Sequence, residues 1–293
     1  MAAGRLAGAC AGMAAVLLIV KTPLVRRLAQ DELVRLEAGG VVDGQRLAAS
    51  AERQDETLSA VRAALAGETV RERLFDQLSP DDARDADLVV TVGGDGTVFT
   101  ANTLATTAPY ITVNSDPERS VGHFTRFTAA TIAEGLSGWR AGSLATEDLH
   151  RLAITVGGVE RHILNDCLFA HSNPAVLSRY VLEVDGQREF QRSSGVWVST
   201  AHGSTAAIRS AGADPVASHL AALLFKVREP FLAREPAYLL GGSQLPPRSL
   251  HLTPAIPGMA LYLDGPNITV PVLPGMQVDI RPATSPLRLL RLT

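Results

Sequence analysis

The chain has 293 residues, of which 46% are hydrophobic and 19% charged, and its formal net charge is −3. This composition is typical of a globular protein and excludes wholesale disorder or a fibrous protein. The length predicts two domains, or one core domain with a large inserted unit. Because basic residues do not outnumber acidic ones, no surplus charge is available to bind nucleic acid. The longest apolar run, residues 13–20, is too short for a membrane helix, so no membrane partner is expected either.

The first part of the chain alternates between strand-like and helix-like patterns. Continuous apolar runs of strand length are followed by segments whose apolar residues recur at helical spacing. The predicted strands lie at residues 14–21, 87–92 and 108–113, and the predicted helices at 23–36, 48–66 and 98–107. This alternation predicts a Rossmann-like α/β domain with a parallel sheet over residues 1–125.

From about residue 149 the pattern changes to short segments of alternating polarity, separated by turn-forming pairs such as Asp185-Gly186 and Asp264-Gly265. The segments lie at residues 152–156, 179–184, 196–200 and 261–263. They predict a β-rich, β-sandwich-like C-terminal domain over residues 126–274. We interpret the Pro-rich stretch 245–258 as a loop. The pattern leaves open whether residues 275–293 return to the first domain or stay in the second.

The two cysteines, Cys10 and Cys167, form no CxxC pair and support neither a disulfide framework nor a zinc site. A reducing compartment fits this usage, and we expect a cytoplasmic protein. Residues 1–12 are interpreted as a loose N-terminus, with an organelle-targeting segment as the alternative. The histidines show no metal-ligand spacing, so no metal site built from protein side chains is predicted.

A glycine-rich segment directly follows a predicted strand. Gly93 and Gly94 allow a close approach of phosphate to the backbone, and Thr97 is expected to open a helix behind them. Backbone N–H groups at such a turn, together with Gly96, can bind phosphate. A carboxylate in a phosphate-binding turn repels the phosphate, so Asp95 is expected to have a function there, as a base or as a magnesium ligand. The alternative is that Asp95 is only a turn residue. The lack of a GxxxxGK[ST] motif disfavours a Walker-type NTPase.

The segment Gly93-Gly94-Asp95-Gly96-Thr97 resembles the signature shared by NAD kinases, diacylglycerol and sphingosine-type lipid kinases, and phosphofructokinases. Three downstream segments narrow the resemblance: residues 113–120 followed by Gly122-His123, then Asn165-Asp166, then residues 203–206. In order and spacing they resemble NAD kinases, and the run DPERSxGH is similar to the mitochondrial-type branch of that family.

This resemblance implies an enzyme that transfers the γ-phosphoryl group of ATP, bound with Mg²⁺, to the 2′-hydroxyl of the adenosine ribose of NAD and so forms NADP. It also implies a homodimer or homotetramer. Asp95 matches the family's catalytic aspartate, and Asn165 and Asp166 match the pair that contacts the dinucleotide, with a simple turn as the alternative for that pair. The remaining nucleotide-binding candidates are Gly93, Gly94, Gly96, Thr97, Asn114, Arg179, Gly203, Ser204, Thr205, Ala206 and Ser210.

The chain departs from the family pattern at three other positions. Ala207 stands where the family has an aromatic residue, His202 is an unexpected occupant, and Ser194 replaces a carboxylate that many bacterial members have. The choice between NAD and NADH, and between ATP and polyphosphate, is therefore open. Two other functions also stay open: a lipid kinase that shares the glycine segment, and a nucleotide-binding protein without catalytic activity.

Overall fold

A computed structural model describes residues 13–104, 106–231, 242–243 and 248–293. The chain divides into two compact units. The first comprises the residues up to Thr97 together with Leu104–Ala145 and Leu290–Thr293, and the second comprises Val98–Thr103 and Thr146–Leu289. The segment 1–12, interpreted above as a loose N-terminus or a targeting segment, lies outside the described residues.

The first unit is built on a largely parallel sheet, as the alternating pattern predicted. Strands β1, β3 and β4 are almost wholly buried and β2 is exposed at the edge, where it pairs only with β1 among the described strands. The sheet order is β2-β1-β3-β4-β19-β6, with β5 paired to β4. The strands are β1 (Ala15–Val20), β2 (Thr69–Leu74), β3 (Leu88–Gly93), β4 (Tyr110–Asn114), β5 (Phe127–Thr128), β6 (Ala145–Leu149) and β19 (Leu287–Arg291).

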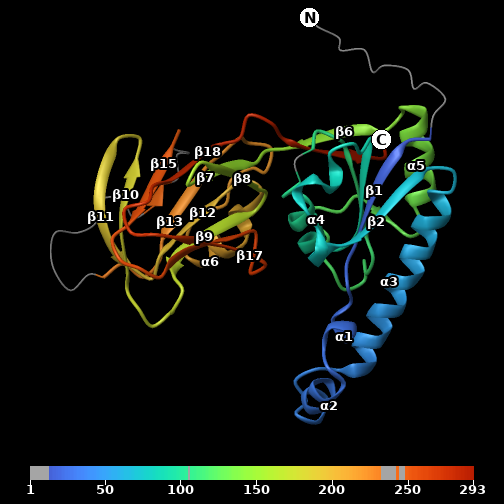
Figure 1. The fold of residues 1–293 in the computed structure, drawn as a ribbon, viewed down its shortest axis with the longest axis horizontal. Helices are drawn as coiled ribbons and strands as arrows, with labels where there is room; N and C mark the ends of the chain where they lie inside the picture. Colours follow the sequence, from blue (N-terminus) through green and yellow to red (C-terminus); the bar gives the residue numbers. More distant parts are fainter. Residues whose placement is uncertain (1–12, 105, 232–241, 244–247) are drawn as a thin grey trace, which may run out of the picture. The chain divides into compact units, whose positions relative to one another are not determined.

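Two helices, α3 (Gly44–Ala64) and α5 (Ile132–Ala141), cover one side of this sheet (Figure 1). Leu58 and Val61 of α3 join Ile132 and Leu136 of α5 in one apolar core with the strands, which is what an amphipathic helix does on a sheet. The helix predicted at residues 48–66 therefore exists. It begins four residues earlier, because the Asp43 side chain caps it by accepting a hydrogen bond from the Arg46 N–H.

Two predicted helices differ from the structure. The one at residues 23–36 is split into α1 (Leu24–Arg27) and α2 (Gln30–Ala38), since Leu28 and Ala29 have extended backbones between them. The one at residues 98–107 is α4 (Asp95–Ala101), so it begins at the aspartate of the glycine segment rather than after Thr97. It ends early because the poor helix formers Asn102 and Thr103 follow. The Asn102 side chain donates to the carbonyl of His162.

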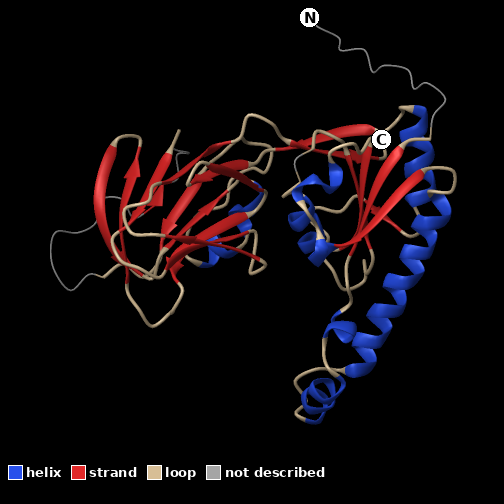
Figure 2. Ribbon diagram, viewed as in Figure 1, coloured by secondary structure: helices blue, strands red, loops and turns tan. Residues whose placement is uncertain are grey.

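The second unit is a sandwich of two mainly antiparallel sheets, which confirms the β-rich prediction (Figure 2). One sheet has the order β11-β10-β15-β18-β7-β8 and the other β14-β13-β12-β9-β16-β17, and their inner faces share one apolar core. The strands of the first are β7 (Leu152–Val156), β8 (Val159–Ile163), β10 (Ser178–Val184), β11 (Gln187–Ser193), β15 (Leu250–Pro254) and β18 (Val278–Pro282). Those of the second are β9 (Asp166–His171), β12 (Val196–Ser199), β13 (Leu224–Val227), β14 (Gly242–Ser243), β16 (Met259–Leu263) and β17 (Ile268–Val272).

The stretch 245–258 is not all loop, because it contains β15. Leu250 and Leu252 are fully buried, whereas His251 and Thr253 are half-buried, so burial alternates as it does in a strand. Proline stands only at the end of the strand. Short helical turns complete the chain: Phe75–Gln77, Pro80–Ala83, His202–Thr205 and α6 (Ala207–Ser210). None of the described helices combines the length and the apolar character that a bilayer crossing requires.

Candidate functional site

The glycine turn stands at the carboxyl end of β3, where Gly93 pairs with Asn114 of β4. A Cβ on Gly93 would lie 2.2 Å from the Thr97 hydroxyl oxygen and 2.9 Å from the Lys21 Cβ, so no larger residue fits. At Gly94 a Cβ would lie 3.2 Å from the Ser120 hydroxyl, which shows how closely the loop after β4 packs on the turn. The turn is thus a tight, pre-formed element of the first unit.

Asp95 opens α4 directly after this turn, and its side chain is half-buried. Its carboxylate accepts hydrogen bonds from two consecutive backbone N–H groups, at 3.0 Å from His123 and 2.7 Å from Phe124. These partners come from a loop about thirty residues later in the chain, so the carboxylate does more than close its own turn. Sequence analysis did not assign these N–H groups, because every residue except proline carries one; only the Gly122-His123 pair marked the loop.

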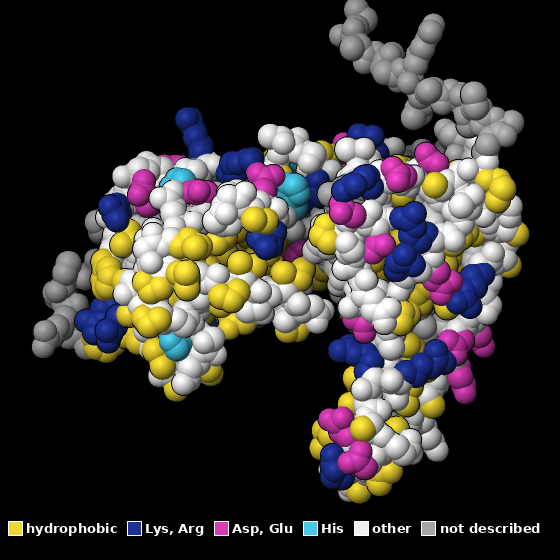
Figure 3. All heavy atoms as spheres, in the orientation of Figure 1, with side chains coloured by type: hydrophobic (Ala, Val, Ile, Leu, Met, Phe, Trp, Pro, Cys, Tyr) yellow, Lys and Arg dark blue, Asp and Glu magenta, His cyan; other side chains and the backbone are white. Residues whose placement is uncertain are grey.

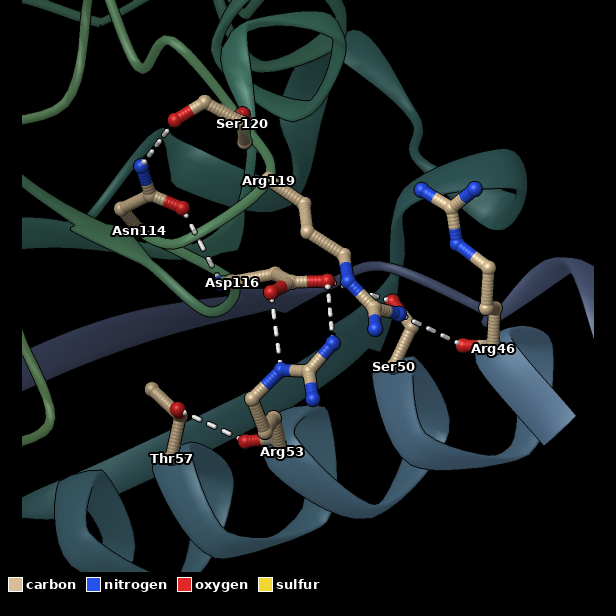
Figure 4. Close-up of polar contacts among 8 residues, drawn as sticks. All are labelled: Arg46, Ser50, Arg53, Thr57, Asn114, Asp116, Arg119 and Ser120. Atoms are coloured by element: carbon tan, nitrogen blue, oxygen red, sulfur yellow. Dashed lines mark hydrogen bonds and ion pairs between the residues drawn. The ribbon is translucent and has the colours of Figure 1, made fainter.

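The loop that supplies these N–H groups is organised by Asn114 (Figure 4). The Asn114 amide donates to the Ser120 carbonyl at 3.3 Å and accepts from the Asp116 N–H at 3.0 Å. Gly122 has a φ of 63°, and a Cβ there would lie 2.4 Å from the Asn114 amide nitrogen. Asn114, which was predicted to bind nucleotide, is buried. Its side chain holds the loop that orients Asp95.

The same loop is anchored to α3 through Asp116, as Figure 4 shows. The Asp116 carboxylate accepts two hydrogen bonds from the Arg53 guanidinium, at 2.8 and 3.0 Å, and one from the Ser50 hydroxyl at 2.8 Å. The bond from Arg53 is the largest effect that holds the pKa of Asp116 below its ordinary value. Arg119 is exposed and donates to the Arg46 carbonyl of α3 at 3.0 Å.

In the second unit, Asn165 and Asp166 stand where the chain enters β9, next to the glycine-containing segment 203–206. A Cβ on Gly203 would lie 2.2 Å from the Asn165 carbonyl oxygen and 2.5 Å from the Ser199 hydroxyl oxygen. Glycine is therefore required for these segments to pack against each other. The structure thus brings together Asn165, Asp166 and Gly203, which the sequence separates by almost forty residues.

The Asp166 carboxyl group is buried and faces the first residue of α6. It accepts a hydrogen bond from the Ala207 backbone N–H, but burial is the stronger effect and raises the pKa of Asp166 to about 6. Ala207 thus contributes to the pair through its backbone, although its side chain lacks the aromatic ring that the family pattern has. A carboxyl group with such a raised pKa in a cluster of matched motifs is typical of a functional site.

The other predicted residues lie in differing surroundings. Ser204 is fully buried, and its hydroxyl exchanges hydrogen bonds with the backbone of Val216. Thr205 and Ser210 are exposed, and Ala206 is half-buried. Arg179 is exposed on β10, in the other sheet of the sandwich, so the structure does not bring it beside Asn165 and Asp166.

Metal-binding groups are not found in the parts of the chain that the structure describes: no three His, Cys, Asp or Glu side chains gather there in a way that could hold an ion. Cys167 is a free, buried thiol of the sandwich core.

Comparisons with known proteins show which family the chain resembles. Residues 24–143 match the family described as the ATP-NAD kinase N-terminal domain. A probable NADH kinase of Oryza sativa subsp. japonica is 36% identical over 177 residues, which cover 52% of this chain and 54% of the relative. An NADH kinase of Arabidopsis thaliana is 30% identical over 67% of this chain and 70% of its own length. An NAD kinase of Methanoregula boonei is 30% identical over 69% and 73%, respectively.

Solved structures share the fold. The crystal structure of yeast NADH kinase complexed with NADH matches with a TM-score of 0.69 and 15% identity, covering 97% of this chain and 85% of that one. The crystal structure of an NAD kinase from Archaeoglobus fulgidus in complex with ATP matches with a TM-score of 0.60 and 20% identity, covering 95% and 94%. At these identities the likeness is one of architecture.

Proposed function

The chain belongs to the NAD kinase family, and on that premise we propose that it transfers the γ-phosphoryl group of ATP to the 2′-hydroxyl of the adenosine ribose of NAD, giving NADP and ADP. The 2′-oxygen forms a bond to the γ-phosphorus while the bond from that phosphorus to the β,γ-bridging oxygen breaks. The hydroxyl proton must pass to a base as the new bond forms.

The observation that carries this proposal is the Asp95 carboxylate, fixed by the N–H groups of His123 and Phe124 beside the glycine turn. Two backbone hydrogen bonds restrict its orientation, while each oxygen retains a second lone pair that can accept a proton. Such a restrained carboxylate suits a general base, whose contribution depends first on geometry. Asp95 accepts the proton of the 2′-hydroxyl in this proposal.

The glycine turn has the proposed role of receiving phosphate. Gly93, Gly94 and Gly96 present no side chain that would keep a phosphoryl group away from the backbone, and Thr97 follows within the same turn. Asn114 supports the turn from the neighbouring strand. Transfer then depends mostly on positioning and on electrostatic stabilisation of the phosphoryl oxygens.

The nucleotide acceptor is bound by residues of the second unit. Asn165 can donate and accept hydrogen bonds at once, and the Asp166 carboxyl group can accept from a ribose hydroxyl. Gly203, Ser204, Thr205, Ala206 and Ser210 form the neighbouring wall for the adenosine part, with Ser204 acting through the backbone that its hydroxyl holds in place. Arg179 lies in the other sheet of the sandwich, so the role proposed for it is a phosphate contact and not a contact with the ribose.

Magnesium enters with ATP rather than with the protein. Mg²⁺ usually keeps several waters, so the phosphate oxygens of ATP would hold it in this proposal. When bound, it supplies positive charge to the phosphoryl group. The residues of the chain orient the nucleotides and accept the proton.

The test is a coupled assay for NADP formation from NAD, ATP and Mg²⁺, with NADH as the acceptor in a parallel series. Formation of NADP or NADPH supports the proposal, and the ratio of the two rates identifies the preferred acceptor. Phosphorylation of diacylglycerol in place of NAD would instead support the lipid kinase, and tight NAD binding without turnover the non-catalytic protein. Neither alternative is favoured by the relatives reported above.

Three further properties belong to this proposal: an oligomeric state implied by the family resemblance, a compartment that fits the cysteine usage, and a partner class excluded by the charge balance. The protein is a homodimer or homotetramer, is cytoplasmic, and has no nucleic-acid partner. Hydrophobic side chains gather over the second unit on the face drawn in Figure 3, which supports self-association of that unit. Light scattering during size-exclusion chromatography measures the mass of the assembly.

A further inference from the structure

Asp264 stands in a turn after β16 and carries an unusual combination of features. Its φ is 48°, in the left-handed region that few residues other than glycine adopt, and Gly265 follows with a φ of 103°. Only 7% of the residue is exposed. Its carboxylate accepts hydrogen bonds from the N–H groups of Leu164, at 2.9 Å, and Asn165, at 2.8 Å.

The backbone around Asn165 is also held from the other side. The Thr200 hydroxyl donates to the Leu164 carbonyl at 2.6 Å, and the Thr200 N–H donates to the Asn165 carbonyl at 3.0 Å. The Asp264 N–H in turn donates to the Asp166 carbonyl at 2.9 Å. The main chain of residues 164–166 is therefore fixed by its neighbours, whereas no described residue forms a hydrogen bond with the Asn165 side-chain amide.

Burying the carboxyl group of Asp264 is unfavourable, and a turn does not require it. Burial raises the pKa of its carboxyl group to about 7; the N–H groups of Leu164 and Asn165 oppose that rise, and the neighbouring Asp166 adds to it. The Asp185-Gly186 turn shows that the same conformation forms without burial: its φ is also 48°, and its carboxylate accepts from the consecutive N–H groups of Arg248 and Ser249 at the surface. Turn formation alone does not account for a buried carboxyl group.

We propose that Asp264 is a positioning residue for the nucleotide acceptor: by holding the N–H groups of Leu164 and Asn165, it directs the Asn165 side chain and the Asp166 carboxyl group toward the ribose of NAD. This inference rests on the proposed function of Asn165 and Asp166. Asp264 touches neither the nucleotide nor the phosphoryl group and acts through the backbone of residues 164–166.

The variant that tests this role is Asp264→Asn. Asp185→Asn serves as a surface control in which asparagine keeps the one oxygen, Oδ1, that accepts both N–H groups. At position 264, asparagine tolerates the left-handed conformation and keeps the size of the side chain, but its amide nitrogen cannot accept the second N–H. We expect the KM for NAD to rise roughly tenfold, as the loss of one buried hydrogen bond predicts. The KM for ATP should change by less than about twofold, because independent sites rarely couple more strongly. Asp185→Asn should change neither constant.

A second measurement separates positioning from general stabilisation. Hydrogen exchange of the Leu164 and Asn165 amides in the ligand-free protein should accelerate in Asp264→Asn and stay unchanged in Asp185→Asn. If Asp264→Asn does not fold, Thr200→Val loosens the same segment from its other side and should also raise the KM for NAD selectively. An unchanged KM for NAD, or equal increases for NAD and ATP, overturns the inference.

These outcomes are distinct from a failure of the proposed function. If the wild-type protein forms no NADP, the proposed reaction is wrong, yet the exchange experiment still reports whether Asp264 holds the segment and calorimetry still reports whether NAD binding weakens in the variant. If the wild type is active and the variant behaves like Asp185→Asn, only the positioning role is refuted.

Discussion

The two Asp-Gly turns of the sandwich share the φ of their aspartate and differ in their surroundings. Asp185 and Asp264 share a φ of 48°, and each carboxylate accepts hydrogen bonds from two consecutive backbone N–H groups. Asp185 does so at the surface, where water solvates the carboxylate, whereas Asp264 does so inside the unit, where burial raises its pKa to about 7. The Asp-Gly motif determines the turn conformation, and burial determines how far the pKa of the carboxyl group is raised.

Asp95 of the first unit repeats this arrangement in a third setting. Its half-buried carboxylate also accepts two consecutive N–H groups, from His123 and Phe124, but it follows a glycine turn rather than forming an Asp-Gly hairpin. These three aspartates thus have different proposed roles: a base, a positioning residue and a surface turn. Asp95 and Asp264 accept through both carboxylate oxygens, whereas Asp185 accepts both N–H groups on Oδ1 alone. Their exchange for asparagine separates these roles.

Asp95→Asn is expected to have the largest effect. Asparagine retains an oxygen for one of the two backbone N–H groups but cannot take up the hydroxyl proton, so turnover should fall about 10²-fold or more, the usual contribution of a general base. Steady-state kinetics measure the turnover, and calorimetry should show nearly unchanged affinities for NAD and ATP. Near-normal turnover would falsify the role of Asp95 as the base.

The comparison of the two turns is sharpened by pH. The pKa of Asp264 is raised in the folded state, so the stability that it contributes is present at acidic pH and is lost as the pH rises through about 7. Asp264→Asn removes this titration. The unfolding free energy of the wild type relative to this variant should therefore decrease by about 3 kcal/mol between pH 5 and pH 8, at about 1.4 kcal/mol for each of the roughly two pH units below the pKa.

Denaturant unfolding at both pH values measures this difference. The relative stability of the wild type and Asp185→Asn serves as the control and should stay constant over the same range. A constant difference between the wild type and Asp264→Asn would mean that the buried carboxyl group does not titrate in this interval.

A smaller effect of opposite sign is expected at Asp116, a buried carboxylate that does have a cationic partner. Since the Arg53 guanidinium lowers the pKa of Asp116, the stability from this pair is present near neutral pH and is lost as the pH falls through the lowered pKa. Arg53→Met should lower the melting temperature at pH 7 by a few degrees, on the order of 3 °C. The difference should vanish in acid.

The exposed pair Arg35–Asp31 provides the matched control, because both of its side chains are about 70% exposed. Arg35→Met should leave the melting temperature unchanged. If the two variants behave alike, the anchoring of the loop by Asp116 contributes nothing measurable.

The sequence predicted the architecture well, since periodicity records which side of an element is buried. The buried strands β1, β3 and β4 and the shift to antiparallel sheets were foreseen on this basis. The strand β2 was missed, because TVRERL at an exposed edge has no apolar face to reveal it. Residues 250–254 were interpreted as loop because nearby prolines outweighed an alternation of only five residues.

Residues of the candidate site could be predicted only where a residue type or a motif marks them. The glycine segment was predicted from its residue types, and Asn165-Asp166 and Gly203 through the family resemblance. The structure packs Gly203 on Asn165. The contributions of His123, Phe124 and Ala207 could not, since these residues act through N–H groups that have no sequence signature. The burial of Asp264 was also inaccessible, because Asp185-Gly186 has the same two letters at the surface.

The hydrogen bonds that fix residue 165 involve its backbone, so they do not depend on which side chain stands there. Every contact that fixes the segment engages a peptide group, while a methyl group on Gly203 would strike the Asn165 carbonyl. Replacement of the side chain at position 165 therefore leaves the scaffold undisturbed, whereas replacement of its neighbour at 203 does not. In engineering terms, 165 is the position to randomise in a search for altered cofactor acceptance, and 203 is the position to leave alone.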